Sequence, residues 1–153
     1  MSSLRPSERL ARILVVDATG QLASDLDEAL QDLRRRMVTA RTCAEAWMLV
    51  HQATFDTVVV EEAAEGGWQD LLAEISAMGA GLPVIIASRT ADDRLWVDAL
   101  AAGAYDVLST PLEAAETRRV IQLATTKRCC NSDQRRRFSR ARWPALRQAT
   151  AAS

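Results

Sequence analysis

Four short apolar runs, rich in valine and isoleucine, limit this chain to a small set of folds. They are Ile13–Val16, Thr57–Val60, Val84–Ala87 and Tyr105–Leu108. A run that is largely apolar, without strict alternation of polar residues, is typical of a strand buried on both faces. A polar residue closely follows each run, and in chain order these residues are Asp17, Glu61, Ser88 and Thr110.

Apolar residues between the runs recur at helical spacing. They predict an amphipathic helix over about 20–35, carried by Leu22, Leu26, Ala29, Leu30 and Leu33, and a short strand follows at Met37–Ala40. Further helices are predicted after Thr42 as N-cap, around Trp68–Ile75, and over 91–102 and 113–126. Five strands alternating with five helices predict an α/β fold whose doubly wound parallel sheet is covered on both faces.

The polar residues that follow the runs are candidates for one shared site. Parallel strands end at the same edge of a sheet, and ligands of such folds bind at that edge. We therefore expect Asp17, Glu61, Ser88 and Thr110 to converge there.

Length and composition indicate one soluble domain. The 153 residues fit a lead (1–10), a domain (11–126) and a tail (127–153). No apolar run approaches the ~20 residues that a membrane span needs, and the start of the chain lacks the apolar part of a secretion signal. The odd number of cysteines, 3, suits a reducing compartment. We expect a cytoplasmic protein without a membrane span.

Charge is divided unevenly along the chain. Residues 1–126 hold 11 Lys and Arg against 19 Asp and Glu, whereas residues 127–153 hold 8 against 1. The tail is expected to be flexible, and its arginines stand among aromatic residues; they include Arg135, Arg136, Arg137, Arg140 and Arg142. This pattern is compatible with nucleic acid, an acidic partner, an anionic membrane surface or the acidic body of the chain itself, and a tail without any partner stays open.

The most specific motif runs from Ala101 to Pro111 and reads Ala-Ala-Gly-Ala-Tyr-Asp-Val-Leu-Ser-Thr-Pro. Ile-Leu-Val-Val-Asp and Phe-Asp-Thr-Val-Val-Val precede it in that order. With these motifs the chain resembles a bacterial response-regulator receiver domain over about 11–126. The resemblance implies the CheY-like, flavodoxin-like fold with strand order 2-1-3-4-5 and a role in two-component signal transduction or a phosphorelay.

In working receivers, two acids after the first strand hold Mg²⁺, and an Asp ending the third strand accepts the phosphoryl group. A Ser or Thr after the fourth strand binds the phosphate, and a Lys before a cis-proline pairs with its charge. Carried over, Asp17 matches the first acid and Ser88 the hydroxyl, but Ala18 replaces the second acid, Glu61 the acceptor and Thr110 the lysine. The resemblance thus implies at most weak Mg²⁺ binding at Asp17, no other cofactor, and no phosphotransfer.

These replacements favour a pseudo-receiver, a non-enzymatic protein-interaction module that works without phosphorylation. Two interpretations of Glu61 stay open, a permanent stand-in for the phosphorylated state or a plain exposed carboxylate. Arg89 is a candidate counter-charge over an acidic pocket of Asp17, Glu61 and Glu62. The alternatives are a phosphorelay regulator with residual phosphoacceptor activity, or binding of nucleic acid or an acidic partner through the tail.

The resemblance also implies where a protein partner binds. Receivers commonly use the fourth helix, the fifth strand and the fifth helix, and a histidine kinase, an output protein or a second copy of the chain is the expected partner. Trp96 lies on the fourth helix, either as an interface residue or as a cover over the edge of the core. Val107 stands where the family often has a switch aromatic and is the second interface candidate.

Overall fold

The computed structural model describes residues 10–79 and 81–126, and strands and helices alternate along them. The order is β1 (Ala11–Val16), α1 (Gln21–Ala29), β2 (Arg35–Ala40), α2 (Cys43–Gln52), β3 (Thr57–Glu61), α3 (Trp68–Ala77), β4 (Val84–Ser88), α4 (Asp93–Ala101) and β5 (Asp106–Ser109). A final helix follows from 114 to the end of the described part at 126. The predicted tail (127–153) and nearly all of the predicted lead (1–10) lie outside the described residues.

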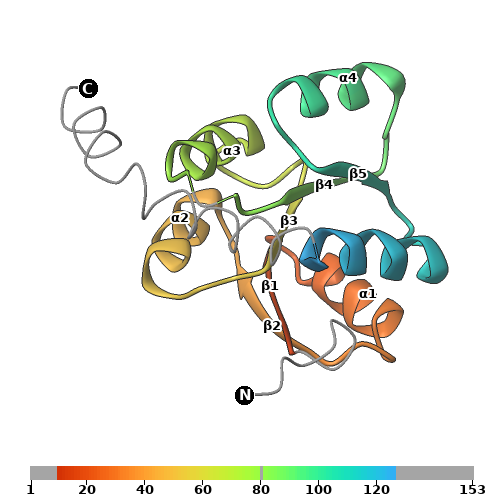
Figure 1. The fold of residues 1–153 in the computed structure, drawn as a ribbon. Helices are drawn as coiled ribbons and strands as arrows, with labels where there is room; N and C mark the ends of the chain where they lie inside the picture. Colours follow the sequence, from red (N-terminus) through yellow and green to blue (C-terminus); the bar gives the residue numbers. More distant parts are fainter. Residues whose placement is uncertain (1–9, 80, 127–153) are drawn as a thin grey trace, which may run out of the picture.

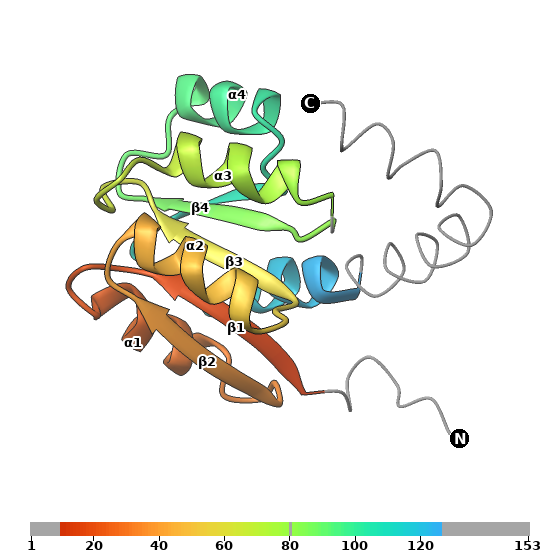
Figure 2. The same cartoon turned by 90° about the vertical axis from the view of Figure 1, so that its left-hand side faces the viewer.

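The five strands form one parallel sheet in the order β2-β1-β3-β4-β5, which confirms the predicted fold. Figures 1 and 2 show α1 and the final helix on one face of the sheet, and α2, α3 and α4 on the other. Among the described residues, no helix has both the length and the apolar character needed to cross a membrane.

Alternate residues of each central strand enter different cores, which explains why the strand sequences are apolar throughout. Leu14 and Val16 of β1 pack in the core under α2, α3 and α4. Ile13 and Val15 pack in the core under α1 and the final helix. Successive side chains of a strand point to opposite faces, so a strand covered on both sides has no polar face.

The first helix is shorter than the sequence predicts. The predicted helix over 20–35 is wrong at its end, because α1 ends at Ala29 and β2 already begins at Arg35. Leu30 and Leu33 lie in the turn after α1, and both are buried. They therefore continue the spacing of the buried helix face although they are not part of the helix. The Arg35 guanidinium donates hydrogen bonds to the carbonyls of Leu30 at 2.6 Å and Leu33 at 3.1 Å. A cationic side chain that binds the last carbonyls of a helix stabilises this kind of ending.

Thr117, on the final helix, has a buried hydroxyl group that forms no hydrogen bond with the described residues. The residue is 1% exposed, and its Oγ1 has no hydrogen-bond partner among the described residues. A buried hydroxyl without a partner costs free energy that an isosteric methyl group does not. We predict that Thr117→Val raises the free energy of unfolding by about 1 kcal/mol, measured by urea denaturation.

Thr125, on the same helix, provides the matched control. Its hydroxyl lies 3.3 Å from that of Thr57 and shares a buried hydrogen bond with it. Thr125→Val leaves the Thr57 hydroxyl unpaired and is expected to destabilise the protein. A Thr117→Val variant that is no more stable than wild type would contradict the assignment of an unsatisfied hydroxyl.

Candidate functional site

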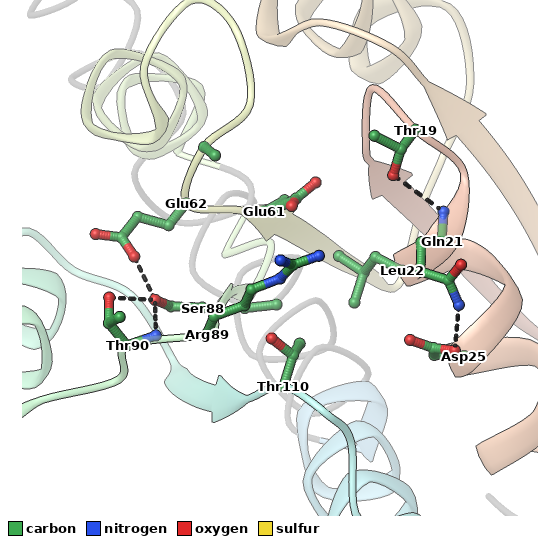
Figure 3. Close-up of a pocket in the computed structure, with 12 residues that line it drawn as sticks. Thr19, Gln21, Leu22, Asp25, Glu61, Glu62, Ser88, Arg89, Thr90 and Thr110 are labelled. Carbon is green, nitrogen blue, oxygen red and sulfur yellow. Dashed lines mark hydrogen bonds between the residues drawn. The ribbon is translucent and has the colours of Figure 1, made fainter.

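The carboxyl ends of β3, β4 and β5 and the start of α1 enclose a cavity of about 600 Å³ (Figure 3). Glu61, Ser88 and Thr110, three of the four side chains predicted to converge, line it, and so do Glu62 and Arg89. Asp17 does not line the cavity but lies next to it, because Val16 pairs with Val60 in the sheet and the residues that follow are Asp17 and Glu61. These side chains therefore converge at this edge of the sheet as expected, and their role as a site stays a prediction.

Asp17 holds the start of α1. Its Oδ2 accepts hydrogen bonds from the backbone N–H of Leu22 at 2.7 Å and of Ala23 at 3.3 Å. Its Oδ1 accepts from the backbone N–H of Thr19 at 3.1 Å and from the Thr19 hydroxyl at 3.2 Å. The N-cap residue, Gly20, has no side chain to do this. Asp17, only 3% exposed, thus acts as the cap of the helix.

Asp17 also shares a hydrogen bond with Glu61. Burial acts to raise the pKa of Asp17, but the hydrogen bond with Glu61 and those from Thr19, Ala23 and Leu22 outweigh it and lower that pKa. The hydrogen bond with Asp17, burial and repulsion from the Asp17 charge raise the pKa of Glu61, and only Arg89 opposes them. Two carboxyl groups in contact repel each other when both are ionised, so the pKa of one of them rises, and here it is the pKa of Glu61 that rises.

Glu62, the next residue, pairs with Ser88 and not with Asp17. The Ser88 hydroxyl donates a hydrogen bond to Glu62 Oε2, and the backbone N–H of Glu62 donates to Ala87 O at 2.8 Å. Ser88 is 3% exposed and Glu62 is half-buried at the edge of the cavity, so the hydrogen bond between them is partly buried. The sequence predicted one acidic pocket of Asp17, Glu61 and Glu62. In the structure Asp17 and Glu61 interact with each other, whereas Glu62 interacts with Ser88.

Thr110 and Arg89 occupy the remaining side of the cavity. The backbone N–H of Thr110 donates to Ser88 O at 2.9 Å, and a cis peptide bond joins Thr110 to Pro111. The Arg89 side chain extends into the cavity (Figure 3), and its charge lowers the pKa of Glu61. No ion pair within 4.0 Å joins Arg89 to another described residue. Its predicted role as counter-charge stays a prediction.

Two side chains of α1 complete the site and were not singled out from the sequence. Gln21 and Asp25 line the cavity, and Gln21 Nε2 donates to Asp25 Oδ1 at 2.9 Å. The only signal in the sequence is a pair of polar residues four apart at the start of a helix, which is too common to indicate a site. Thr19 and Thr90, also at the cavity, gave no signal.

The residues present do not fit a magnesium ion. Mg²⁺ in proteins is bound through carboxylates and water, but Ala18 supplies no side-chain oxygen. The oxygens of Asp17 already accept hydrogen bonds from Thr19, Leu22 and Ala23. Among the residues that the structure describes, no group of three or more His, Cys, Asp or Glu side chains is placed to hold a metal ion.

Of the two predicted interface residues, only Trp96 is exposed. Trp96 is 45% exposed on α4, beside Val97 at 66% and Leu100 at 40%. Val107 is buried in the core under α2, α3 and α4, so its side chain is not available to a partner.

The family profile described as the response regulator receiver domain matches residues 13–122. The chain therefore belongs to the receiver domains of response regulators, which act in two-component signalling. A comparison with curated proteins gave no match.

Solved structures agree on the fold. The chain is similar to NtrX from Brucella abortus, solved in complex with ADP, at 26% identity and a TM-score of 0.71, covering 88% of this chain and 29% of that one. The receiver domain of an HD domain-containing protein from Pseudomonas fluorescens Pf-5 is 23% identical, with a TM-score of 0.71 and coverage of 80% and 99%. A receiver domain protein from Clostridium thermocellum is 22% identical, with a TM-score of 0.71 and coverage of 79% and 98%.

The raised pKa of Glu61 makes stability depend on pH in a defined direction. Because the pKa of Glu61 is raised in the folded protein, its contribution to stability is complete below its ordinary value of 4.5 and declines as the pH rises. A glutamine at this position still donates an N–H to Asp17 and has no proton to lose. We predict that Glu61→Gln has a higher melting temperature than wild type at pH 7, and that this difference shrinks toward pH 4.5.

The control for this measurement is Glu74→Gln, which changes an exposed glutamate of α3. Its difference from wild type should stay constant over the same pH range. A Glu61→Gln difference that is equally constant would contradict the raised pKa of Glu61.

Proposed function

We propose that this receiver domain is a protein-interaction module that does not depend on phosphorylation, because its own side chains satisfy its acceptor site. The observation that carries this proposal is the pairing of the acids. Asp17 is paired with Glu61, and Ser88 with Glu62. The proposal places the module in bacterial signal transduction and assigns it no catalytic residue.

The chemistry of phosphoryl transfer supports this proposal. The reaction needs an ionised nucleophile and positive charge around the transferred group. The raised pKa of Glu61 favours its protonated form, and its side chain is one methylene longer than that of the usual aspartate. Thr110 brings no charge in place of the lysine, and the remaining groups do not fit Mg²⁺.

A receiver with residual phosphoacceptor activity is the second candidate, and Arg89 is the observation that favours it. Its guanidinium reaches the cavity and is the positive side chain among the residues that line it. A cation there would neutralise part of the charge of an incoming phosphoryl group.

The partner surface that we propose is the outer face of α4 with the neighbouring β5 and final helix. α4 buries Leu95 and Ala99 but exposes Trp96, Val97 and Leu100. Leu100 follows Val97 by three residues and Trp96 by four, so these three side chains lie on one side of the helix. Tryptophan is enriched among residues that dominate binding energy. A histidine kinase, an output protein or a second copy of the chain would bind here. Nucleic-acid binding through the tail (127–153) concerns residues outside those described.

The proposal predicts that the wild-type protein forms no phosphoryl adduct. The measurement is intact mass after incubation with acetyl phosphate or phosphoramidate, with and without Mg²⁺. The positive control is a variant that restores the usual groups, with Ala18→Asp, Glu61→Asp and Thr110→Lys combined. An adduct on the wild-type protein at Glu61, Glu62 or Asp17 would overturn the proposal and favour the second candidate.

A further inference from the structure

We propose that Glu62 is an internal ligand of Ser88, and that its carboxylate holds the segment between β4 and α4 in one arrangement. In this role Glu62, and not Glu61, stands in for the phosphoryl group that the matching hydroxyl binds in working receivers. The inference rests on the proposed function, since a site that accepts phosphate would have to release this contact.

The backbone places Glu62 where it meets Ser88. Glu61 is the last residue of β3 and pairs in the sheet with Ala87 of β4. The N–H of Glu62 then donates to Ala87 O at 2.8 Å, so residue 62 lies beside the end of β4. From there its side chain turns to the Ser88 hydroxyl (Figure 3). A hydrogen bond to an ionised acceptor is about twice as strong as one between neutral groups.

The two consecutive acids are divided between the neighbouring strands. Glu61 pairs with Asp17 after β1, whereas Glu62 pairs with Ser88 at the end of β4. Glu61 is thereby engaged on the far side of β3 from Ser88, since β3 lies between β1 and β4 in the sheet. Only Glu62 of the two acids contacts the hydroxyl that would otherwise bind phosphate.

A continuous series of hydrogen bonds runs from Glu62 to the first turn of α4. Ser88 Oγ donates to Glu62 and accepts from the Thr90 N–H at 3.0 Å. The Asp92 N–H donates to Thr90 O at 2.6 Å. The Asp92 carboxylate then accepts from the Leu95 N–H at 2.8 Å as the N-cap of α4. Loss of the Glu62 contact leaves Ser88 Oγ with Thr90 alone, through the Thr90 N–H and the Thr90 hydroxyl 3.4 Å away, and weakens the first link of this series.

The same helix presents the exposed apolar face described above. Leu95, whose N–H ends the hydrogen-bonded series, packs into the core, and the next residue, Trp96, is exposed. The arrangement of the segment 89–92 therefore sets how α4 begins and which way Trp96 faces. Glu62 is a positioning residue for that surface, acting through Ser88.

The test is amide hydrogen exchange by NMR on Glu62→Ala, measured at Thr90 and Leu95. We expect exchange at both amides to become about tenfold faster, as the loss of a charge-assisted hydrogen bond would produce. Glu62→Gln keeps an oxygen that accepts from Ser88, so its exchange should stay closer to wild type. Exchange at the central β3 residue Val59 should not change in either variant.

Two further variants make the result specific. Glu65→Ala removes an exposed glutamate from the same loop and should leave Thr90 and Leu95 unchanged. Ser88→Ala removes both the Glu62 contact and the acceptor of the Thr90 N–H, so exchange at Thr90 should rise at least as much as in Glu62→Ala. Adding Glu62→Ala to Ser88→Ala should have no further effect. Glu62→Leu, which keeps the length of the side chain but has no acceptor, serves in place of Glu62→Ala if that variant does not fold.

Unchanged exchange at Thr90 and Leu95 in Glu62→Ala would overturn the inference, whatever Ser88→Ala shows. So would full additivity of the two substitutions. This outcome is distinct from failure of the proposed function, which appears as a phosphoryl adduct on the wild-type protein and does not depend on exchange rates.

Discussion

The carboxylate of Asp17 joins three parts of the molecule at the edge of the sheet. It follows β1, accepts hydrogen bonds from the first turn of α1, and shares a hydrogen bond with Glu61 at the end of β3. In a receiver that binds Mg²⁺, an acid at this position is a ligand of the metal. Here the backbone N–H groups of Thr19, Leu22 and Ala23 and the hydrogen bond with Glu61 already engage that carboxylate. The same carboxylate therefore caps α1 and joins it to the ends of β1 and β3.

The site as a whole follows from this arrangement. With Glu61 held toward β1, the carboxyl group that reaches Ser88 is that of Glu62. Hydrogen bonds between protein groups then join each strand end around the cavity to the next one. The last of them is donated by the backbone N–H of Thr110 to Ser88 O. Under the proposed function, an acceptor site that is satisfied internally has little to gain from an added phosphate. The α4 surface would then be the same at all times for a partner to bind.

The sequence predicted the sheet well because strands buried on both faces leave a continuous apolar signature, as Ile13–Val16 does. It also predicted which residues follow the strand ends, and hence that Glu61, Ser88 and Thr110 share one cavity. It did not predict which acid pairs with which partner. Glu61 and Glu62 are adjacent in the chain, and only the direction of each side chain decides which one meets Asp17 and which one meets Ser88. The end of α1 was missed for a similar reason. The apolar pattern continues through Leu30 and Leu33, although α1 has ended at Ala29. The hydrogen bonds from Arg35 to the carbonyls of these two residues cannot be read from the sequence.

The central claim is that internal carboxyl groups already occupy the acceptor site. The most direct measurement compares ¹H–¹⁵N NMR spectra of the wild-type protein with and without beryllofluoride and Mg²⁺. Beryllofluoride is a stable analogue of the phosphoryl group. The account predicts that the resonances of Glu61, Ser88, Thr90 and Thr110 do not move. A saturable shift of these resonances would contradict it, because the analogue would then have displaced the internal pairs.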